Sequence, residues 1–254
     1  MTGDVYAGRH RRVGGVGAIR VPRWTSGPAA DRVLAAQVVV IAKEPLPGRV
    51  KTRLTPPFTP AEAAALAEAA LVDTLAAVAD TPVARRVLAL EGVSGRWLPD
   101  GFEVIGQRGA GLDERIAWAL TDAQEALAAP VVLIGMDTPQ VTPGLLAAAA
   151  EPLVSDTADA TFGMAEDGGF WLLGLRKIDP ALVLGVPMSQ PDTGSRQLAR
   201  LERAGLRIRR LPELIDVDTV SEAEHIAAAT PGSAFATCMT SLRNGAAQAV
   251  AVAR

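Results

Sequence analysis

The sequence has very little of several residue types on which common catalytic sites are built. It contains one cysteine, Cys238, and two histidines, His10 and His225, which lie far from any strong motif. A single cysteine excludes an internal disulfide, and the scarcity of histidine argues against a Ser-His-Asp hydrolase or a histidine-rich zinc site. Any chemistry must therefore rest on carboxylates, cations and backbone amides.

Aromatic residues and long apolar runs are also scarce. Aromatics make up 4% of the 254 residues, so the core must be built from alanine, valine and leucine. The formal net charge of −3 argues against a general nucleic-acid binder. No apolar run approaches the ~18 residues of a membrane helix, and the basic N-terminus lacks the apolar region of a signal peptide. We expect a soluble, cytoplasmic protein with neither a membrane nor a nucleic acid as partner.

Two common nucleotide-binding motifs are missing. The G-x-G-x-x-G pattern of dinucleotide-binding folds does not follow the first apolar strand. The stretch "PGRVKT" resembles a P-loop but has Val50 in place of the second glycine, and the next helix begins only at Thr59 and Pro60. If the chain binds a nucleotide, it must use another kind of loop.

Apolar strands and amphipathic helices alternate along most of the chain. Expected strands cover residues 37–42, 84–90, 102–106, 130–137, 158–165, 169–175 and 206–212, and expected helices cover 59–78, 112–127, 143–153, 193–204 and 220–229. This alternation predicts an α/β fold with a mostly parallel sheet and helices on both faces. Ligands in such sheets bind beyond the carboxyl ends of the strands.

The two ends of the chain differ from this pattern. Residues 1–35 show no clear period, and we interpret them as a poorly ordered N-terminal extension. Residues 36–231 would form a single α/β domain. Residues 232–254 are rich in small side chains, which predicts a tail that is a weak helix or disordered.

A loop rich in cations follows the first expected strand. The stretch "AKEPLPGRVKTRL", from Ala42 to Leu54, contains four cations: Lys43, Arg49, Lys51 and Arg53. Prolines stiffen this loop, Pro47 among them, and Gly48 permits close approach to a ligand. Lysine and arginine bind phosphate oxygens, so the loop predicts a polyphosphate site. The alternative is a solvated surface loop.

Asp137 is the first of several candidate metal ligands. It follows the apolar run "PVVLIGM", and Thr142 with Pro143 already supplies the start of the next helix. Asp137 is thus left without an evident structural task, which favours a ligand for Mg²⁺ or Mn²⁺.

A second acidic group lies in "IDVDTVSEAEH". Thr219 and Glu222 form a capping box there, so neither Asp216 nor Asp218 is required as a helix cap. Asp218 is equally suited to be a cap or a metal ligand. With Asp137, one of these aspartates would give a divalent cation two carboxylates.

Two glycine-containing stretches are ambiguous. Asp167, Gly168 and Gly169 form either an ordinary hairpin turn or a turn whose glycines let the backbone approach a ligand. In "QRGAGLDER", Gly111 precedes a helix whose N-terminus either faces a nucleotide or follows a plain loop.

Taken in order, AKxPxPGxVKTRL, GxDxP, DGGFWLLGL and D-x-D-T resemble the DUF2064 family, also labelled "transferase 1, rSAM/selenodomain-associated" and often described as glycosyltransferases. The resemblance covers about residues 37–230, and the chain departs from the pattern at Asp113, where members often carry glycine. It is more distantly similar to phospholactate and molybdenum-cofactor guanylyltransferases. The resemblance implies a GT-A (nucleotide-diphospho-sugar transferase) three-layer sandwich, with the nucleotide on the first loop and Mg²⁺ on Asp137.

We therefore expect a Mg²⁺-dependent (or Mn²⁺-dependent) transferase that moves a nucleotidyl group from a nucleoside triphosphate to a small phosphorylated acceptor. The alternatives are a glycosyltransferase with a nucleotide-sugar donor and a non-catalytic nucleotide-binding protein. The expected catalytic residues are Lys51, Arg53 and Asp137. The expected nucleotide-binding residues are Ala42, Lys43, Pro47, Gly48, Arg49, Lys51, Arg53, Gly111, Asp167, Gly168 and Gly169. The expected metal ligands are Asp137, Asp216 and Asp218.

Overall fold

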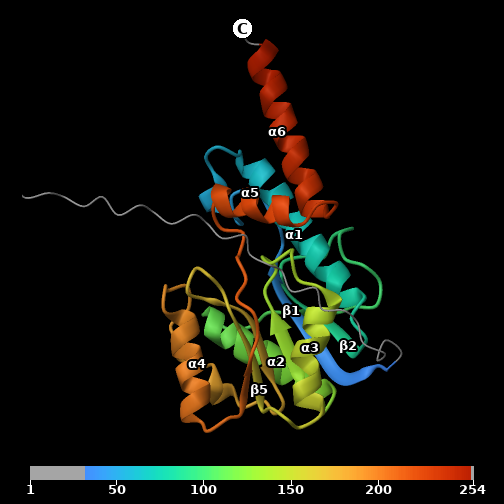
Figure 1. Ribbon diagram of the computed structural model, residues 1–254, viewed down its shortest axis with the longest axis vertical. Helices are drawn as coiled ribbons and strands as arrows, with labels where there is room; N and C mark the ends of the chain where they lie inside the picture. The colour runs from blue at the N-terminus through green and yellow to red at the C-terminus, as the bar shows by residue number, and fades with distance from the viewer. Residues whose placement is uncertain (1–31, 253–254) are drawn as a thin grey trace, which may run out of the picture.

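The computed structural model describes residues 32–252, with side chains described up to residue 245. Most of the expected N-terminal extension, residues 1–31, lies outside the described residues. Within the described part, a central sheet lies between two layers of helices (Figure 1). This arrangement confirms the expected three-layer α/β sandwich.

The sheet of the described chain has seven strands in the order β3-β2-β1-β4-β6-β5-β7. These are β1 Leu34–Lys43, β2 Val83–Glu91, β3 Glu103–Gly106, β4 Val131–Ile134, β5 Ala160–Met164, β6 Phe170–Leu175 and β7 Ile208–Arg210. β6 runs antiparallel to both of its neighbours, while all other pairs are parallel. The prediction of a mostly parallel sheet is therefore confirmed.

Helices cover both faces of this sheet. They are α1 Pro60–Ala79, α2 Leu112–Ala126, α3 Pro143–Val154, α4 Thr193–Arg203, α5 Val220–Ala229 and α6 Ala234–Val252, with short 3₁₀ turns η1 Thr52–Leu54 and η2 Pro180–Leu182. α1 and α3 pack on one face, and α2 and α4 pack on the other. β1 is covered on both sides, which is why Val38, Val39 and Val40 are consecutive apolar residues with no exposed surface.

The start of α1 follows from local sequence. The Thr59 hydroxyl accepts the Glu62 backbone N–H, and the Glu62 carboxylate accepts the Thr59 N–H at 2.7 Å. Pro60 occupies the first helical position, where no donor is needed. The capping box fixes where the cation-rich loop ends and the helix begins.

Several strands are shorter than expected, β4 and β7 by the most. β4 ends at Ile134 rather than at Asp137, and β7 keeps only three residues. After β4 the chain leaves the sheet, and the Met136 sulfur accepts the backbone N–H of Lys43 at 3.3 Å. Asp137 therefore stands beyond the carboxyl edge of the sheet, not within it.

The last helix is anchored at its beginning. Asp73 of α1 accepts the backbone N–H groups of Ala234 and Phe235, each at 2.8 Å, and Phe235 and Met239 are buried. Farther along, α6 extends away from the sheet (Figure 1). Residues 234–252 of the expected tail are thus helical, while the division of the chain at residues 35 and 231 stays a prediction.

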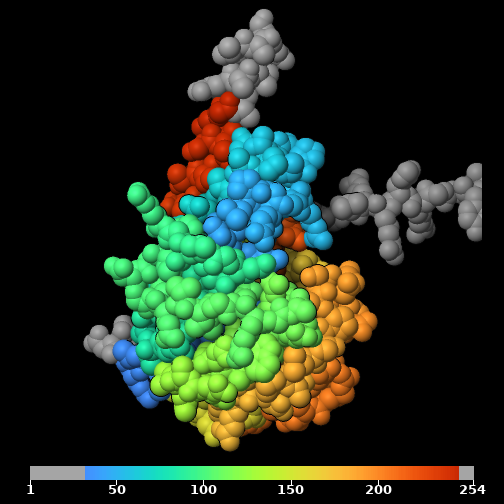
Figure 2. Space-filling model, turned by 180° about the vertical axis from the view of Figure 1, so that it is seen from behind, coloured from blue at the N-terminus to red at the C-terminus, as the bar shows by residue number. Residues whose placement is uncertain are grey.

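Seen from behind, the loop after β1 (blue) forms a lobe beside α6, above the green surface that includes α2 (Figure 2).

None of the helices in the described part combines the length and apolarity needed to cross a membrane.

Candidate active site

A pocket of about 560 Å³ opens at the carboxyl ends of β1 and β4. The connection after β1 leads through α1 to one side of the sheet, and α2 leads to β4 on the other side. The strand order therefore reverses between β1 and β4, and such a switch point leaves a crevice for ligands. The antiparallel β6 begins at the same edge, so the hairpin between β5 and β6 also reaches the pocket.

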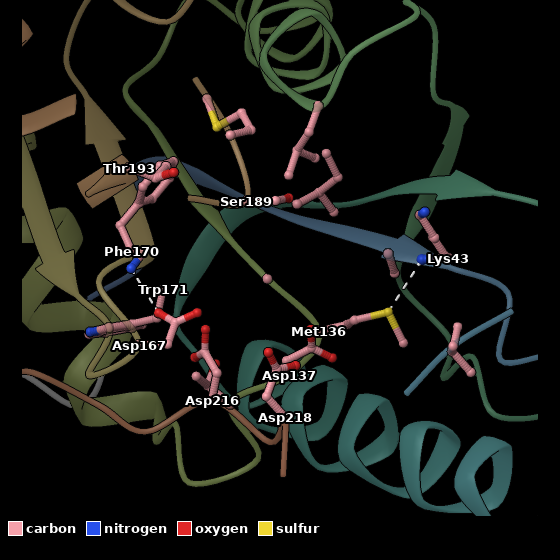
Figure 3. A pocket seen from close by; sticks show the side chains of 18 of the residues that line it. Lys43, Met136, Asp137, Asp167, Phe170, Trp171, Ser189, Thr193, Asp216 and Asp218 are labelled. Carbon is pink, nitrogen blue, oxygen red and sulfur yellow. Dashed lines mark hydrogen bonds between the residues drawn. The ribbon is translucent and has the colours of Figure 1, made fainter. Parts of the chain in front are cut away.

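Four carboxylates meet along one side of the pocket (Figure 3). Asp137 follows β4, and Asp167 lies in the β5–β6 hairpin, where its Oδ1 accepts the Gly169 N–H at 2.7 Å. Asp216 and Asp218 come from the segment after β7. Residues from three separate parts of the chain thus form one acidic cluster.

The segment after β7 crosses back over the edge of the sheet. Leu214 bridges to Ala165, and the Val217 N–H donates to the Asp137 carbonyl at 3.0 Å. The Trp171 indole N–H donates to the Pro212 carbonyl at 3.0 Å. These contacts hold the segment after β7 against the edge of the sheet, so that Asp216 and Asp218 lie near the end of β4 rather than beside β7.

Two of the loop cations are paired with this acidic cluster. The Lys51 ammonium lies 2.9 Å from Asp137 Oδ1 and 3.4 Å from Asp218 Oδ1. The Arg53 guanidinium lies 2.7 Å from Asp218 Oδ2. Asp137 therefore forms an ion pair with Lys51, and the expectation that Asp137 has no structural task is wrong. Asp218 does not cap α5, because Thr219 is the N-cap with its predicted capping box.

The other two cations of the loop meet a different carboxylate. Lys43 and Arg49 lie 3.7 and 3.8 Å from Glu91, at the end of β2. Arg115 of α2 also pairs with Glu91. Three cations share this carboxylate, and the Glu44 carboxylate, which accepts a backbone N–H, lies in the same recess, so the cations outnumber the carboxylates by one.

The acidic cluster changes the protonation of its members. Burial, followed by the charges of Asp137 and Asp167, raises the pKa of Asp216 from 3.8 to about 7. The Oδ1 atom of Asp216 is buried and has no hydrogen-bond partner among the described residues. Burial by itself would lower the pKa of Lys51. The neighbouring carboxylates, Asp137 above all, raise this pKa by more, so the net shift is upward.

Most of the predicted site residues are brought together. Those that line the pocket are Ala42, Lys43, Arg49, Lys51, Arg53, Asp137, Asp167, Gly169, Asp216 and Asp218. Pro47, Gly48, Gly111 and Gly168 are not among its lining residues. At Gly168, with a φ of +89°, an added Cβ would lie 1.8 Å from the Pro191 carbonyl oxygen, so this glycine allows a turn to pack against a loop.

Several lining residues were not predicted. Thr138 is buried, its hydroxyl has no hydrogen-bond partner within the described part of the chain, and its place next to Asp137 in "GMDTP" could have indicated it. Gln107 follows β3 and donates both amide hydrogens to the carbonyls of Ala42 and Ala89, at 2.7 and 2.9 Å. Ser189, with a φ of 57°, lines the opposite wall on a stretch without regular structure, for which the sequence offered no pattern.

The donor chemistry of the acidic cluster fits a divalent cation. Carboxylate oxygens are the ligands that Mg²⁺ and Mn²⁺ prefer, and the unpartnered Oδ1 of Asp216 is such an oxygen. In the described residues, however, no three His, Cys, Asp or Glu side chains are already arranged around one centre. Asp137 and Asp218 are instead gathered around the Lys51 ammonium.

Comparisons with known proteins agree with the motifs. The family model described as "Uncharacterized protein conserved in bacteria (DUF2064)" matches residues 66–190. No curated protein matches the sequence significantly. A structure from Desulfovibrio desulfuricans G20, provisionally named a nucleotide-diphospho-sugar transferase, superposes with a TM-score of 0.74 at 28% identity, over 84% of this chain and 95% of that chain.

More distant structures share less of the fold. The Rv0371c homologue from Mycobacterium sp. strain JC1 has a TM-score of 0.46 and 18% identity, over 81% of this chain and 97% of that one. The 2-C-methyl-D-erythritol 4-phosphate cytidylyltransferase of Thermus thermophilus has a TM-score of 0.46 and 17% identity, over 78% and 98%. The family-model match confirms the resemblance to DUF2064 over residues 66–190, which include the motifs GxDxP and DGGFWLLGL, while the first and last motifs lie outside the matched residues. The chain has the GT-A type fold of nucleotide-diphospho-sugar transferases.

Proposed function

We propose that this protein is a nucleotide-using transferase that works with a divalent cation, and that it moves a nucleotidyl group from a nucleoside triphosphate to a small phosphorylated acceptor. One observation carries the proposal: a single pocket at the switch point of the sheet has a cluster of four carboxylates and, beside it, a group of cations in excess over their carboxylates. Its volume of about 560 Å³ is within the usual range for sites of small ligands and cofactors.

We assign the nucleobase to the apolar wall of the pocket. Ile41, Leu112, Ile116 and Leu133 line this wall, on the α2 side of the sheet. Gln107 borders the pocket with both amide hydrogens already donated, so its remaining polar atom is the acceptor oxygen. An apolar wall with few polar groups suits a flat ring that is oriented by single hydrogen bonds.

We assign the phosphates to the neighbourhood of Lys43 and Arg49. Together with Arg115, these side chains outnumber Glu91 and the neighbouring Glu44 by one, so positive charge remains for an anion. Lys43 and Arg49 are 56% and 66% exposed, which leaves their charged ends accessible. Charge-assisted hydrogen bonds to phosphate oxygens are among the stronger polar contacts in proteins.

We assign the cation, Mg²⁺ or Mn²⁺, to Asp137, Asp216 and Asp218. When bound, the ion would neutralise charge on the phosphate oxygens during transfer. The chain's own groups would bind and orient the nucleotide, and the pocket walls would exclude bulk water. In this assignment Lys51 and Arg53 adjust the charge of the carboxylates as well as contacting the ligand.

The specific alternative is glycosyl transfer from a nucleotide-sugar. It is supported by the provisional name of the Desulfovibrio protein, which shares 28% identity and most of the fold. A large excess of positive charge in the pocket would favour a triphosphate over a nucleotide-sugar. That excess is small, because Lys51 and Arg53 are already paired with carboxylates.

A thermal-shift panel tests the proposal. The full chain is heated with each nucleoside triphosphate, each diphosphate and a set of nucleotide-sugars, with and without Mn²⁺. Because a ligand that binds the folded state stabilises it by mass action, we expect one base to give the largest shift and Mn²⁺ to increase it. A triphosphate that stabilises more than its diphosphate supports nucleotidyl transfer, whereas a sugar that adds to the diphosphate's effect supports glycosyl transfer. No shift with any nucleotide would contradict both.

A further inference from the structure

Lys51 differs from the other cations of its loop. Its side chain is 6% exposed, against 56% for Lys43, 66% for Arg49 and 74% for Arg53. Its backbone has a φ of 48° and a ψ of 39°, a left-handed conformation that residues with a side chain adopt rarely and at a cost. Lys51 is therefore held in place by its surroundings, whereas its neighbours extend into solvent.

The atoms that hold Lys51 are the oxygens that a divalent cation would need. Its ammonium contacts Oδ1 of Asp137 at 2.9 Å and Oδ1 of Asp218 at 3.4 Å. A cation of charge +2 placed on the same oxygens would repel the ammonium strongly at this distance. Lys51 and the divalent cation therefore cannot both keep these contacts.

The Lys51 side chain can also extend into the pocket, which it lines together with Lys43 and Arg49. A displaced ammonium would find partners there only if the pocket held an anion. We propose that Lys51 is the resident counter-ion of the carboxylate cluster in the ligand-free protein, and that a divalent cation binds by displacing it toward an anionic ligand. The inference rests on the cation site of the proposed function, and it makes cation and phosphate binding cooperative.

Binding of Mn²⁺ alone to the full chain tests this displacement. Free Mn²⁺ is measured by electron paramagnetic resonance for the wild type, for Lys51→Met and for Lys177→Met as the matched control. Methionine keeps most of the length of the lysine side chain but removes its charge. We expect Lys51→Met to bind Mn²⁺ at least tenfold more tightly than the wild type. Lys177→Met should stay within about threefold, because Lys177 is exposed and is not among the residues that line the pocket.

A second measurement needs no variant. The chain has three lysines, of which Lys43 and Lys177 are exposed. An amine-acylating reagent followed by mass spectrometry reports the labelling rate of each. We expect Lys51 to be labelled slowly without metal, and at least tenfold faster relative to Lys43 once bound Mn²⁺ has reached saturation.

The outcomes separate the inference from the proposed function. The displacement would be overturned if the wild type and Lys51→Met bound Mn²⁺ with equal affinity, or if Lys51 stayed protected from labelling with Mn²⁺ bound. Either result would still leave a cation site. If Mn²⁺ bound neither protein, both the displacement and the assignment of the cation would fail. Nucleotide binding would still be judged by the thermal-shift panel.

Discussion

Replacing Asp216 by asparagine should stabilise the metal-free protein, and the gain should depend on pH. Burial and the neighbouring carboxylates raise the pKa of Asp216 from 3.8 to about 7 in the folded state. Below about pH 4 the carboxyl is protonated in both states and has no effect on stability. As pH rises from there to about 7, the unfolded chain loses its proton first, so the free energy of unfolding falls. Above pH 7 the loss is complete.

The size of this loss follows from the shift. About three pKa units at 1.36 kcal/mol each give about 4 kcal/mol at pH 8. Asparagine cannot ionise, so Asp216→Asn should recover up to about 4 kcal/mol at pH 8 and almost nothing near pH 4. Because its amide remains a buried polar group with few partners, we expect the observed gain to be about 2–4 kcal/mol.

Equilibrium unfolding in urea, with EDTA present, measures the difference between variant and wild type at pH 5, 6, 7 and 8. The exposed carboxylate of Asp100 supplies a matched control, since Asp100→Asn should change stability little at any pH. A gain from Asp216→Asn that is the same at pH 5 and pH 8 would refute the reasoning, as would a loss of stability at pH 8.

Three further changes test other parts of the structure. Asp137→Asn should abolish Mn²⁺-dependent nucleotide stabilisation and lower the free energy of unfolding by about 1–3 kcal/mol, because Lys51 loses its partner at 2.9 Å; unchanged stability in urea would contradict the ion pair. Arg49→Ala should weaken triphosphate affinity about tenfold by calorimetry, with nucleoside affinity unchanged as the control; equal triphosphate affinity would exclude a phosphate contact. Gly168→Ala should cost more than about 3 kcal/mol, since its Cβ would lie 1.8 Å from a backbone oxygen, whereas Gly185→Ala, with a φ of +76° and open space, should cost about 1–2 kcal/mol of backbone strain. Similar losses at the two glycines would show that the close approach is relieved.

The sequence by itself determined the local elements and the edge at which the site lies. The capping boxes at Thr59 and Thr219 could be predicted because each joins residues three positions apart. The apolar strands and the hairpin at Asp167 could be predicted for the same reason, since their periods and turns depend on near neighbours. That Lys43 and Asp137 follow strands was enough to place both at the carboxyl edge of the sheet.

Which charges meet at that edge was decided only by the tertiary structure. The sequence presented Lys51 and Arg53 as free cations for phosphate, but they contact Asp218, which lies 167 and 165 residues away. That contact exists because the segment after β7 crosses back over β5 and hydrogen-bonds to the Asp137 carbonyl. The same crossing buries Asp216 among carboxylates and raises its pKa. Contacts of this range depend on strand order and on the path of a connection, and no pattern of neighbouring residues specifies either.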